Sequence, residues 1–303
     1  MYRLESPTMT LARLLFLSFS LALSVRPLVS QELPYFVTYS HHLEEPGSLE
    51  VGVKTVSGHP TDGNRFSGNS FEFEYGVRGW WTSEIYLDTQ STSHESTLFT
   101  GVRFENRFRP LLREHVVNPV LYVEFGNISG ANKSLLEVVG HDGAADLTEN
   151  NAATRAETKR EVELKLILSS NARGWNFAEN FTAEKNLKHA PWEFGYAVAA
   201  TRPLRLKASA RECSFCASNL QLGVEMYGGL GDTQSLGTHN TSHYVAPTMN
   251  WALPSGTSLL FSYGFGLNDY SLPHIVRFGM AYEVGQLGRF IHPAHRATTR
   301  GAE

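Results

Sequence analysis

The stretch "REVELKLILSS" (Arg160–Ser170) alternates between two kinds of side chain. Three charged residues take turns with four aliphatic ones: Glu161, Glu163 and Lys165 against Val162, Leu164, Leu166 and Leu168. A helix would scatter these charges around its cylinder, whereas a strand places the aliphatic row on one face and the charges on the other. The stretch therefore predicts a β-strand with one apolar and one charged face.

A strand of this kind fits two architectures. In a soluble sandwich the charged face would meet water, and in an outer-membrane barrel the apolar face would meet lipid while the charged face lines the lumen. The composition, with 42% hydrophobic and 18% charged residues, is compatible with either, because barrel strands alternate instead of running apolar. The remaining strands must decide between the two.

Strand length favours the barrel. Most candidate strands have about ten residues, as a tilted strand needs to cross a bilayer, whereas sandwich strands more often have five or six. The twelve candidates are roughly 48–57, 68–77, 80–90, 95–107, 118–128, 158–170, 174–185, 190–202, 218–229, 241–252, 256–266 and 274–285. The sequence thus predicts an all-β fold, an antiparallel transmembrane barrel of about twelve strands.

The faces of the other strands agree with a lumen. An apolar row opposes a row of charged and small residues in "FEFEY" (71–75), "LQLGVEMYG" (220–228), "LLFSYGFGL" (259–267) and "VRFGMAYEV" (276–284). One residue departs from this rule, because Glu179 shares a face with Trp175, Phe177 and Phe181. A β-bulge that re-aims Glu179, or a position at the membrane rim, would explain the exception.

Connections and aromatic residues indicate how the barrel sits in a membrane. Most of the connections after even-numbered strands are short and the longest, 129–157, follows an odd one, which predicts periplasmic turns on the even side and a short helix in the long outer loop.

Aromatic residues near strand ends predict interfacial girdles; a sandwich core is the alternative. They are Trp80, Trp81, Tyr122, Trp175, Trp192, Tyr244 and Trp251.

The N-terminus carries an export signal. "MTLARLLFLSFSLALSV" (9–25) has one Arg followed by an apolar run, which is typical of a cleaved signal peptide and short for a membrane anchor. Cleavage would follow Ser24 or Ser30. We expect a signal region over 1–30, a periplasmic segment over 31–47, the barrel over 48–285 and a tail over 286–303.

Nearly the whole mature chain resembles bacterial outer-membrane β-barrel proteins of an uncharacterised, porin-like kind. The resemblance rests on the signal, the strands and the loops, with stretches such as "ELPYFVTYSHHLEEPGSLEVGV" (32–53), "NRFRPLLREH" (106–115) and "AEKNL" (183–187). It implies location in the outer membrane, with its lipids and assembly machinery as partners, and passage of small solutes or ions, or a structural role. Many such barrels end on an aromatic residue, whereas Phe290 lies inside the tail of this chain.

The predicted lumen face carries a surplus of acid. It comprises Glu72, Glu74, Glu84, Asp88, Arg103, Glu105, Arg107, Glu124, Glu161, Glu163, Lys165, Glu184, Glu193, Glu225, Arg277 and Glu283. Charges this dense need partners or water. Either they pair into a network that fills the barrel, or the acidic surplus lines a wet channel that favours cations, and about twelve strands are compatible with both.

Two cysteines, Cys213 and Cys216 in "ECSFCASN", form a lone CxxC motif. Zinc needs about four ligands, so the motif is a weak metal signal, and export to an oxidising compartment predicts a local disulfide. A metal or redox site and free thiols are the alternatives.

Other chemistry has weaker support. "THNTSHY" (238–244) offers His239, Ser242 and His243 as candidates for a lipid hydrolase, without a G-x-S-x-G elbow. Loop histidines could converge on a divalent metal, but polar loops commonly carry histidine and we predict neither a metal nor a cofactor. They are His59, His94, His141, His189, His239, His243 and His274. The net charge of −4, without a basic block, argues against a nucleic-acid partner.

Overall fold

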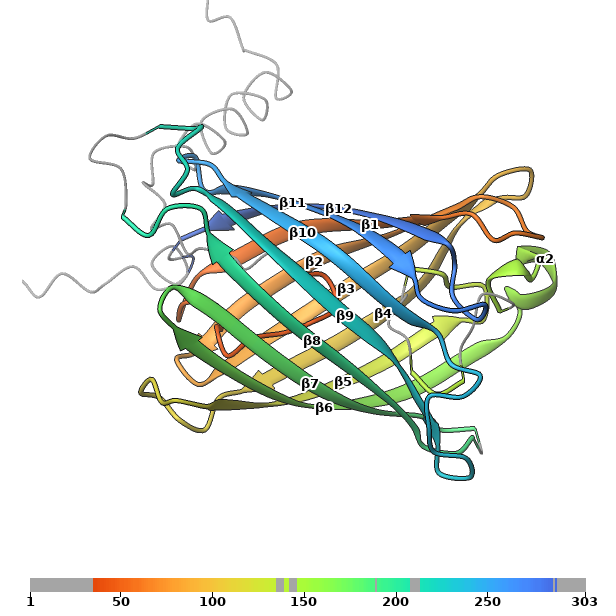
Figure 1. Cartoon of the computed structure of the whole chain (residues 1–303). Coiled ribbons are helices and arrows are strands. Elements are labelled where there is room, and N and C mark those ends of the chain that lie inside the picture. Colours follow the sequence, from red (N-terminus) through yellow and green to blue (C-terminus); the bar gives the residue numbers. More distant parts are fainter. Residues whose placement is uncertain are drawn as a thin grey trace, which may run out of the picture.

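The computed structural model describes residues 35–134, 139–141, 146–188, 190–207, 213–285 and 287. Twelve antiparallel strands form one sheet that closes where β1 pairs with β12 (Figure 1). The strands are β1 Leu49–Gly58, β2 Phe66–Arg78, β3 Trp81–Thr92, β4 Thr97–Phe108, β5 Asn118–Ser129, β6 Thr158–Ala172, β7 Trp175–Asn186, β8 Glu193–Pro203, β9 Leu220–Asp232, β10 His243–Ala252, β11 Thr257–Gly266 and β12 His274–Val284. The predicted barrel is confirmed and the sandwich alternative is wrong.

The outer surface of the barrel is apolar. On β6, Leu164 and Leu166 point outward and are 43% and 41% exposed. Glu163 and Lys165, which alternate with these leucines, point inward and are buried. The same alternation runs along β9, β11 and β12. Because the closed sheet pairs its backbone groups internally and presents an apolar belt, it can span a bilayer. No helix in the described residues is long and apolar enough to cross a membrane.

Glu179 points outward as the alternation of β7 requires. The register of β7 with β6 and with β8 is continuous at this residue, opposite Leu168 and Val198, so no bulge re-aims it. The bulge interpretation is therefore wrong. Glu179 lies in the half of β7 that begins at the periplasmic turn.

The aromatic residues divide into two groups. Trp80, Trp81 and Phe108 stack on one another at the end of the barrel that holds the tight β2–β3 turn, with ring centroids 6.0 to 6.2 Å apart, as a girdle requires. Tyr122 and Tyr244, by contrast, are buried inside the barrel, so their assignment to a girdle is wrong. Tyr122 shares the inward face of β5 with Glu124, to which its hydroxyl donates a hydrogen bond of 2.9 Å.

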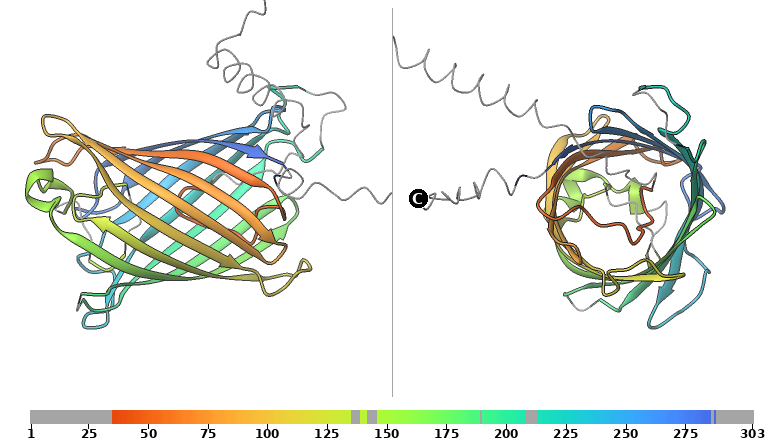
Figure 2. Two further views of the ribbon diagram at one scale, coloured as in Figure 1. Left: turned by 180° about the vertical axis from the view of Figure 1, so that it is seen from behind. Right: turned by 90° about the vertical axis from the view of Figure 1, so that its left-hand side faces the viewer.

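The two ends of the barrel differ. The tight turns β2–β3 and β6–β7 lie at one end, and the long β5–β6 connection lies at the other, with a 3₁₀ helix (Asp146–Thr148) and the short helix α2 (Asn151–Thr154) (Figures 1 and 2). The helix predicted for this loop is therefore confirmed. The signal region over 1–30, His189 and, apart from residue 287, the tail over 286–303 lie outside the described residues.

The N-terminal segment departs from the prediction. Its described part, residues 35–48, lies within the barrel instead of extending into the periplasm, and Figure 2 shows it inside the ring of strands. Gly47 and Ser48 bond the backbone of Gly76 at 2.7 and 3.1 Å, so the segment folds back against β2. A Cβ on Gly76 would lie 2.0 Å from the carbonyl oxygen of Glu45, so this close approach requires glycine. We call residues 35–48 the plug segment.

Candidate functional site: the barrel lumen

A continuous row of glutamates crosses the inner wall. Each glutamate stands opposite the next one in the register of neighbouring strands, from β12 through β1 to β8. The members are Glu283, Glu50, Glu74, Glu84, Glu105, Glu124, Glu163, Glu184 and Glu193. Directly opposed residues have Cβ atoms about 4.5–5.5 Å apart, so neighbouring carboxylates lie close together. We call this set the glutamate row.

The glutamate row climbs the wall from one mouth to the other. Barrel strands are tilted, so a row that follows the sheet hydrogen bonds rises around the barrel. Glu283 lies beside the end of β12 at the mouth with the tight turns, Glu124 lies near the middle of β5, and Glu193 begins β8 at the opposite mouth. The row therefore extends over the height of the membrane-spanning wall.

Basic side chains stabilise the middle of the glutamate row. Like charges directly opposite one another are destabilising, so such a row needs cations beside it. Arg107 contacts Glu74, Glu84 at 3.3 Å and Glu105 at 2.8 Å. Arg103 contacts Glu124 at 2.9 Å, and Lys165 contacts Glu163 at 2.7 Å.

Carboxylates nevertheless outnumber basic groups on the inward face. Arg103 also holds Asp88 at 2.8 Å, and Lys54 on β1 holds Glu72 at 3.0 Å. The structure places all the charged residues predicted for the lumen on the inner face of the strands. The sequence prediction omitted Glu50 and Lys54, although both alternate with valines in "LEVGVKTV" (49–56) in the same way.

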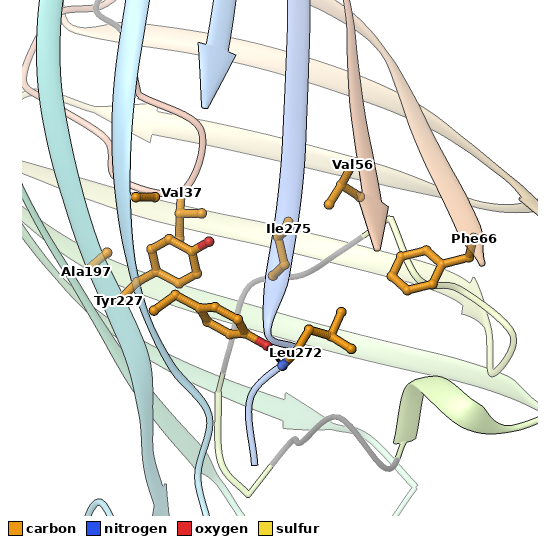
Figure 3. Close-up of a cluster of buried hydrophobic side chains, with 9 residues drawn as sticks. Val37, Val56, Phe66, Ala197, Tyr227, Leu272 and Ile275 are labelled. Carbon is orange, nitrogen blue, oxygen red and sulfur yellow. Dashed lines mark hydrogen bonds between the residues drawn. The ribbon is translucent and has the colours of Figure 1, made fainter. Parts of the chain in front are cut away.

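The first anchor of the plug segment is a buried carboxylate on β9. Glu225 accepts hydrogen bonds from the backbone nitrogens of Phe36, Val37 and Thr38 at 3.1, 3.0 and 2.8 Å. Val37 packs into a buried cluster of apolar and aromatic side chains that includes Tyr227 and comes from one side of the barrel, between β8 and β2 across the β12–β1 closure (Figure 3). Three donors on one carboxylate fix the backbone of the segment against β9.

The second anchor is Tyr39, in the middle of the lumen. Its backbone nitrogen donates to the Asn180 side chain at 2.6 Å, and its carbonyl accepts from the same amide at 2.9 Å. Its hydroxyl donates to Glu105 at 3.2 Å, and the Lys165 ammonium lies 4.8 Å from its ring centre. Tyr39 thus joins β4, β6 and β7 across the barrel.

The third anchor is His41, which is fully buried. Its Nδ1 lies 2.8 Å from the Ser169 hydroxyl and its Nε2 lies 3.0 Å from the Glu114 carboxylate. A hydroxyl, an imidazole and a carboxylate in this order also form the catalytic triads of hydrolases. Ser169, however, is only 2% exposed, so a substrate carbonyl has no access to its hydroxyl. Burial lowers the pKa of His41 against the opposing effect of Glu114. We therefore interpret the contact as a fastening of the plug segment.

The plug segment leaves free space along one side of the lumen. A cavity of about 100 Å³ lies between the segment and strands β1 to β4, and a second cavity of about 40 Å³ is lined by Lys54, Glu72, Arg103, Arg277 and others. Phe36, Tyr39 and Lys54 line both cavities, so the two are neighbours. The remaining space therefore follows the part of the wall where the glutamate row begins.

The long β5–β6 connection narrows the outer mouth. Asn151 accepts a hydrogen bond from Gln90 on β3 at 2.8 Å. On the opposite wall, Gly140 donates to Phe194 on β8 at 2.9 Å and accepts from Gly231 on β9 at 3.2 Å. The connection consequently reaches both sides of the outer opening.

The candidate hydrolase residues do not assemble. The ring nitrogens of His243 contact the hydroxyls of Thr241 at 2.8 Å and Tyr196 at 3.1 Å, whereas Ser242 donates to the Tyr270 carbonyl. His239 is exposed and joins neither. The suggested Ser–His pair is wrong because alternation along β10 and its preceding loop sends the two side chains to different partners. Among the described residues, no group of three or more His, Cys, Asp or Glu could hold a metal ion.

Cys213 and Cys216 are joined by a disulfide, with Cα atoms 5.6 Å apart, in the β8–β9 connection at the end of the barrel that holds the tight turns. Beside it, Trp251 donates to the Ser214 carbonyl at 2.6 Å and its ring lies 4.8 Å from that of Phe215. The bridge therefore belongs to a small aromatic turn at the membrane rim.

We expect this disulfide to be present in protein from the native envelope. Because it closes a very small loop, its reduction should lower the free energy of unfolding by about 2 kcal/mol at most. Alkylation without reductant, followed by mass measurement, should find no modified cysteine. Two alkylated thiols, or a bound metal in equal amount, would contradict the expectation.

No protein-family model matches the chain, and no curated protein matches its sequence. In structure it is similar to the COG4313 outer membrane channel from Pseudomonas putida F1, with 13% identity over 83% of this chain and 99% of that chain and a TM-score of 0.47. It is also similar to the KdgM porin in complex with disordered oligogalacturonate, with 8% identity over 78% of this chain and 98% of that chain and a TM-score of 0.44. A third similar structure is the translocator domain of autotransporter NalP from Neisseria meningitidis, with 13% identity over 91% of this chain and 95% of that chain and a TM-score of 0.41. The closed barrel and its apolar belt give this chain the architecture of a membrane-spanning β-barrel.

Proposed function

We propose that the barrel passes small solutes across the outer membrane and prefers cations. The observation that carries this proposal is the glutamate row, which follows the lumen wall from the periplasmic mouth to the outer mouth. Carboxylates that line a pore lower the energy of a cation inside it relative to an anion. A row without large gaps would offer a cation successive acceptors along its path.

The plug segment sets the size of what can pass. With the segment in place, two small neighbouring cavities lie beside β1 to β4. Passage of anything larger than a small ion therefore requires the segment to move. Its anchors are hydrogen bonds to Glu225, Asn180 and Ser169, which can be exchanged for bonds to water without breaking the strand pairing.

The proposal is tested by neutralising one end of the glutamate row. The double change Glu184→Gln and Glu193→Gln removes two adjacent charges at the outer end with little change of shape. We expect the cation preference, measured as a reversal potential in planar bilayers under a salt gradient, to decrease. Glu179→Gln, an outward-facing change on the same strand β7, is the matched control and should leave it unchanged. Equal effects of the double change and of Glu179→Gln on the reversal potential would contradict the assignment of the cation preference to the glutamate row.

A structural role is the second candidate, favoured by the ion pairs of Arg103 and Arg107 that close the network around the plug segment. It predicts no conductance in the wild type and none after removal of the segment. The same bilayer recordings decide between the two candidates.

A further inference from the structure

The larger cavity gathers several acidic groups around one space. Glu44 from the plug segment faces Glu50 of β1, Glu74 of β2 and Glu84 of β3 across about 100 Å³. The basic residues in its lining, Lys54 and Arg107, contact Glu72 and the glutamate row respectively. His42 also lines the cavity and is exposed, so the space communicates with water.

Glu44 is a lining carboxylate with an unsatisfied hydrogen-bond acceptor. It is 7% exposed, and its Oε1 has no hydrogen-bond partner among the described residues. A buried carboxylate oxygen without a hydrogen-bond donor destabilises the fold, so a ligand that donates a hydrogen bond to this oxygen would be favoured here. Its neighbour Glu45 is exposed and does not line the cavity.

We propose that this cavity is a binding site for a small organic cation with an ammonium group, in which Glu44 is the buried acceptor. The inference deepens the proposed function, on which it rests, by naming the class of cation. An ammonium group carries three donors for the surrounding carboxylates, and the rings of Tyr35, Phe36 and Tyr39 in the lining favour a cation. A chelated metal fits less well, because no metal-holding group is present in the described residues.

Binding at this site should exchange a cation for a proton. Burial, and then the charges of Glu74 and Glu283, raise the pKa of Glu44 to about 8, against the backbone hydrogen bond from Glu45 and the charge of Arg107. At neutral pH the empty site therefore holds a proton on Glu44, which a bound ammonium displaces. Affinity should rise about tenfold between about pH 7 and about pH 9 as this carboxyl ionises. Desolvation inside the barrel, and then the charge of His41, lower the pKa of His42 to about 4, so His42 stays neutral over this range and adds no opposing change.

Titration calorimetry of the full chain in detergent with methylammonium chloride tests the site. Wild type and the control Glu45→Gln should bind methylammonium, more tightly at the higher pH. Glu44→Gln, which resembles the protonated side chain and should fold normally, should bind about tenfold more weakly and lose the pH dependence. Glu44→Asp, which restores the charge, should recover part of the affinity.

One further measurement identifies the ligand class. Tetramethylammonium, which lacks N–H donors, should bind more weakly than methylammonium in the wild type. Unchanged methylammonium affinity in Glu44→Gln, or no binding in the wild type, would overturn the inference even if bilayer currents are cation-selective. Methylammonium binding that depends on Glu44, together with an absence of any current, would support the site and contradict the proposed function alone.

Discussion

Deletion of residues 35–45 should increase the single-channel conductance severalfold. The plug segment crosses the lumen between β9 and the β4–β6 wall, through Glu225, Tyr39 and His41, and cavities of about 100 and about 40 Å³ lie beside it. Without it, the twelve-stranded wall encloses a much wider path. The measurement is the current through single channels in planar bilayers.

A point change should reproduce part of this effect. Glu225→Ala removes the acceptor for three backbone donors of the plug segment and should give brief openings of the larger size. The matched control is Glu45→Gln, on an exposed side chain of the same segment, which should behave as wild type. If the deleted form conducts no better than the wild type, the plug segment is not what limits the path.

The second large effect concerns the lipid face. Leu164→Arg should impair insertion and lower the free energy of folding into a bilayer by about 2–4 kcal/mol, because the side chain points outward near the middle of β6. Thr158→Arg, on the same outward face at the outer end of β6, should cost about 0–1 kcal/mol. Folding titrations in lipid vesicles measure both. Similar costs at the two positions would mean that the apolar face is not the lipid face.

The strands and their faces could be predicted because alternation is a local property. "REVELKLILSS" and "VRFGMAYEV" contain, within one strand, both the period and the identity of the apolar face, and the closed barrel follows from twelve such strands. Most of the inward-facing carboxylates could be named for the same reason. Glu50 was within reach of the same rule, because it alternates with Leu49, Val51 and Val53 in the predicted strand 48–57, but it was missed.

The glutamate row could not be predicted in the same way. Each strand contributes its glutamate at a different height, and only the pairing register brings Glu124, Glu163 and Glu184 opposite one another. That register depends on connections of very different length and on bulges, such as the one between Asp88 and Thr89 against β4. Register across long loops is not encoded in any single stretch of the chain.

The plug segment was missed for a different physical reason. Residues 35–48 show no helical or strand period, so a periplasmic tether is the natural reading of the sequence alone. Their order comes from partners on β4, β6, β7 and β9 that become neighbours only after the barrel closes. Tyr122 and Tyr244 were misassigned for a related reason. An aromatic residue near a strand end fits a girdle, unless the alternation of the strand is followed from the neighbouring charged residues to find which face carries the ring. Both rings lie on the inward face and are buried.

The central claim is that an acidic path through this barrel favours cations. Its most direct test is the sign of the reversal potential in planar bilayers under a potassium chloride gradient, measured for the wild type and for the chain without residues 35–45. We predict a cation-selective sign for both, with larger currents in the second. An anion-selective sign in either would contradict the claim.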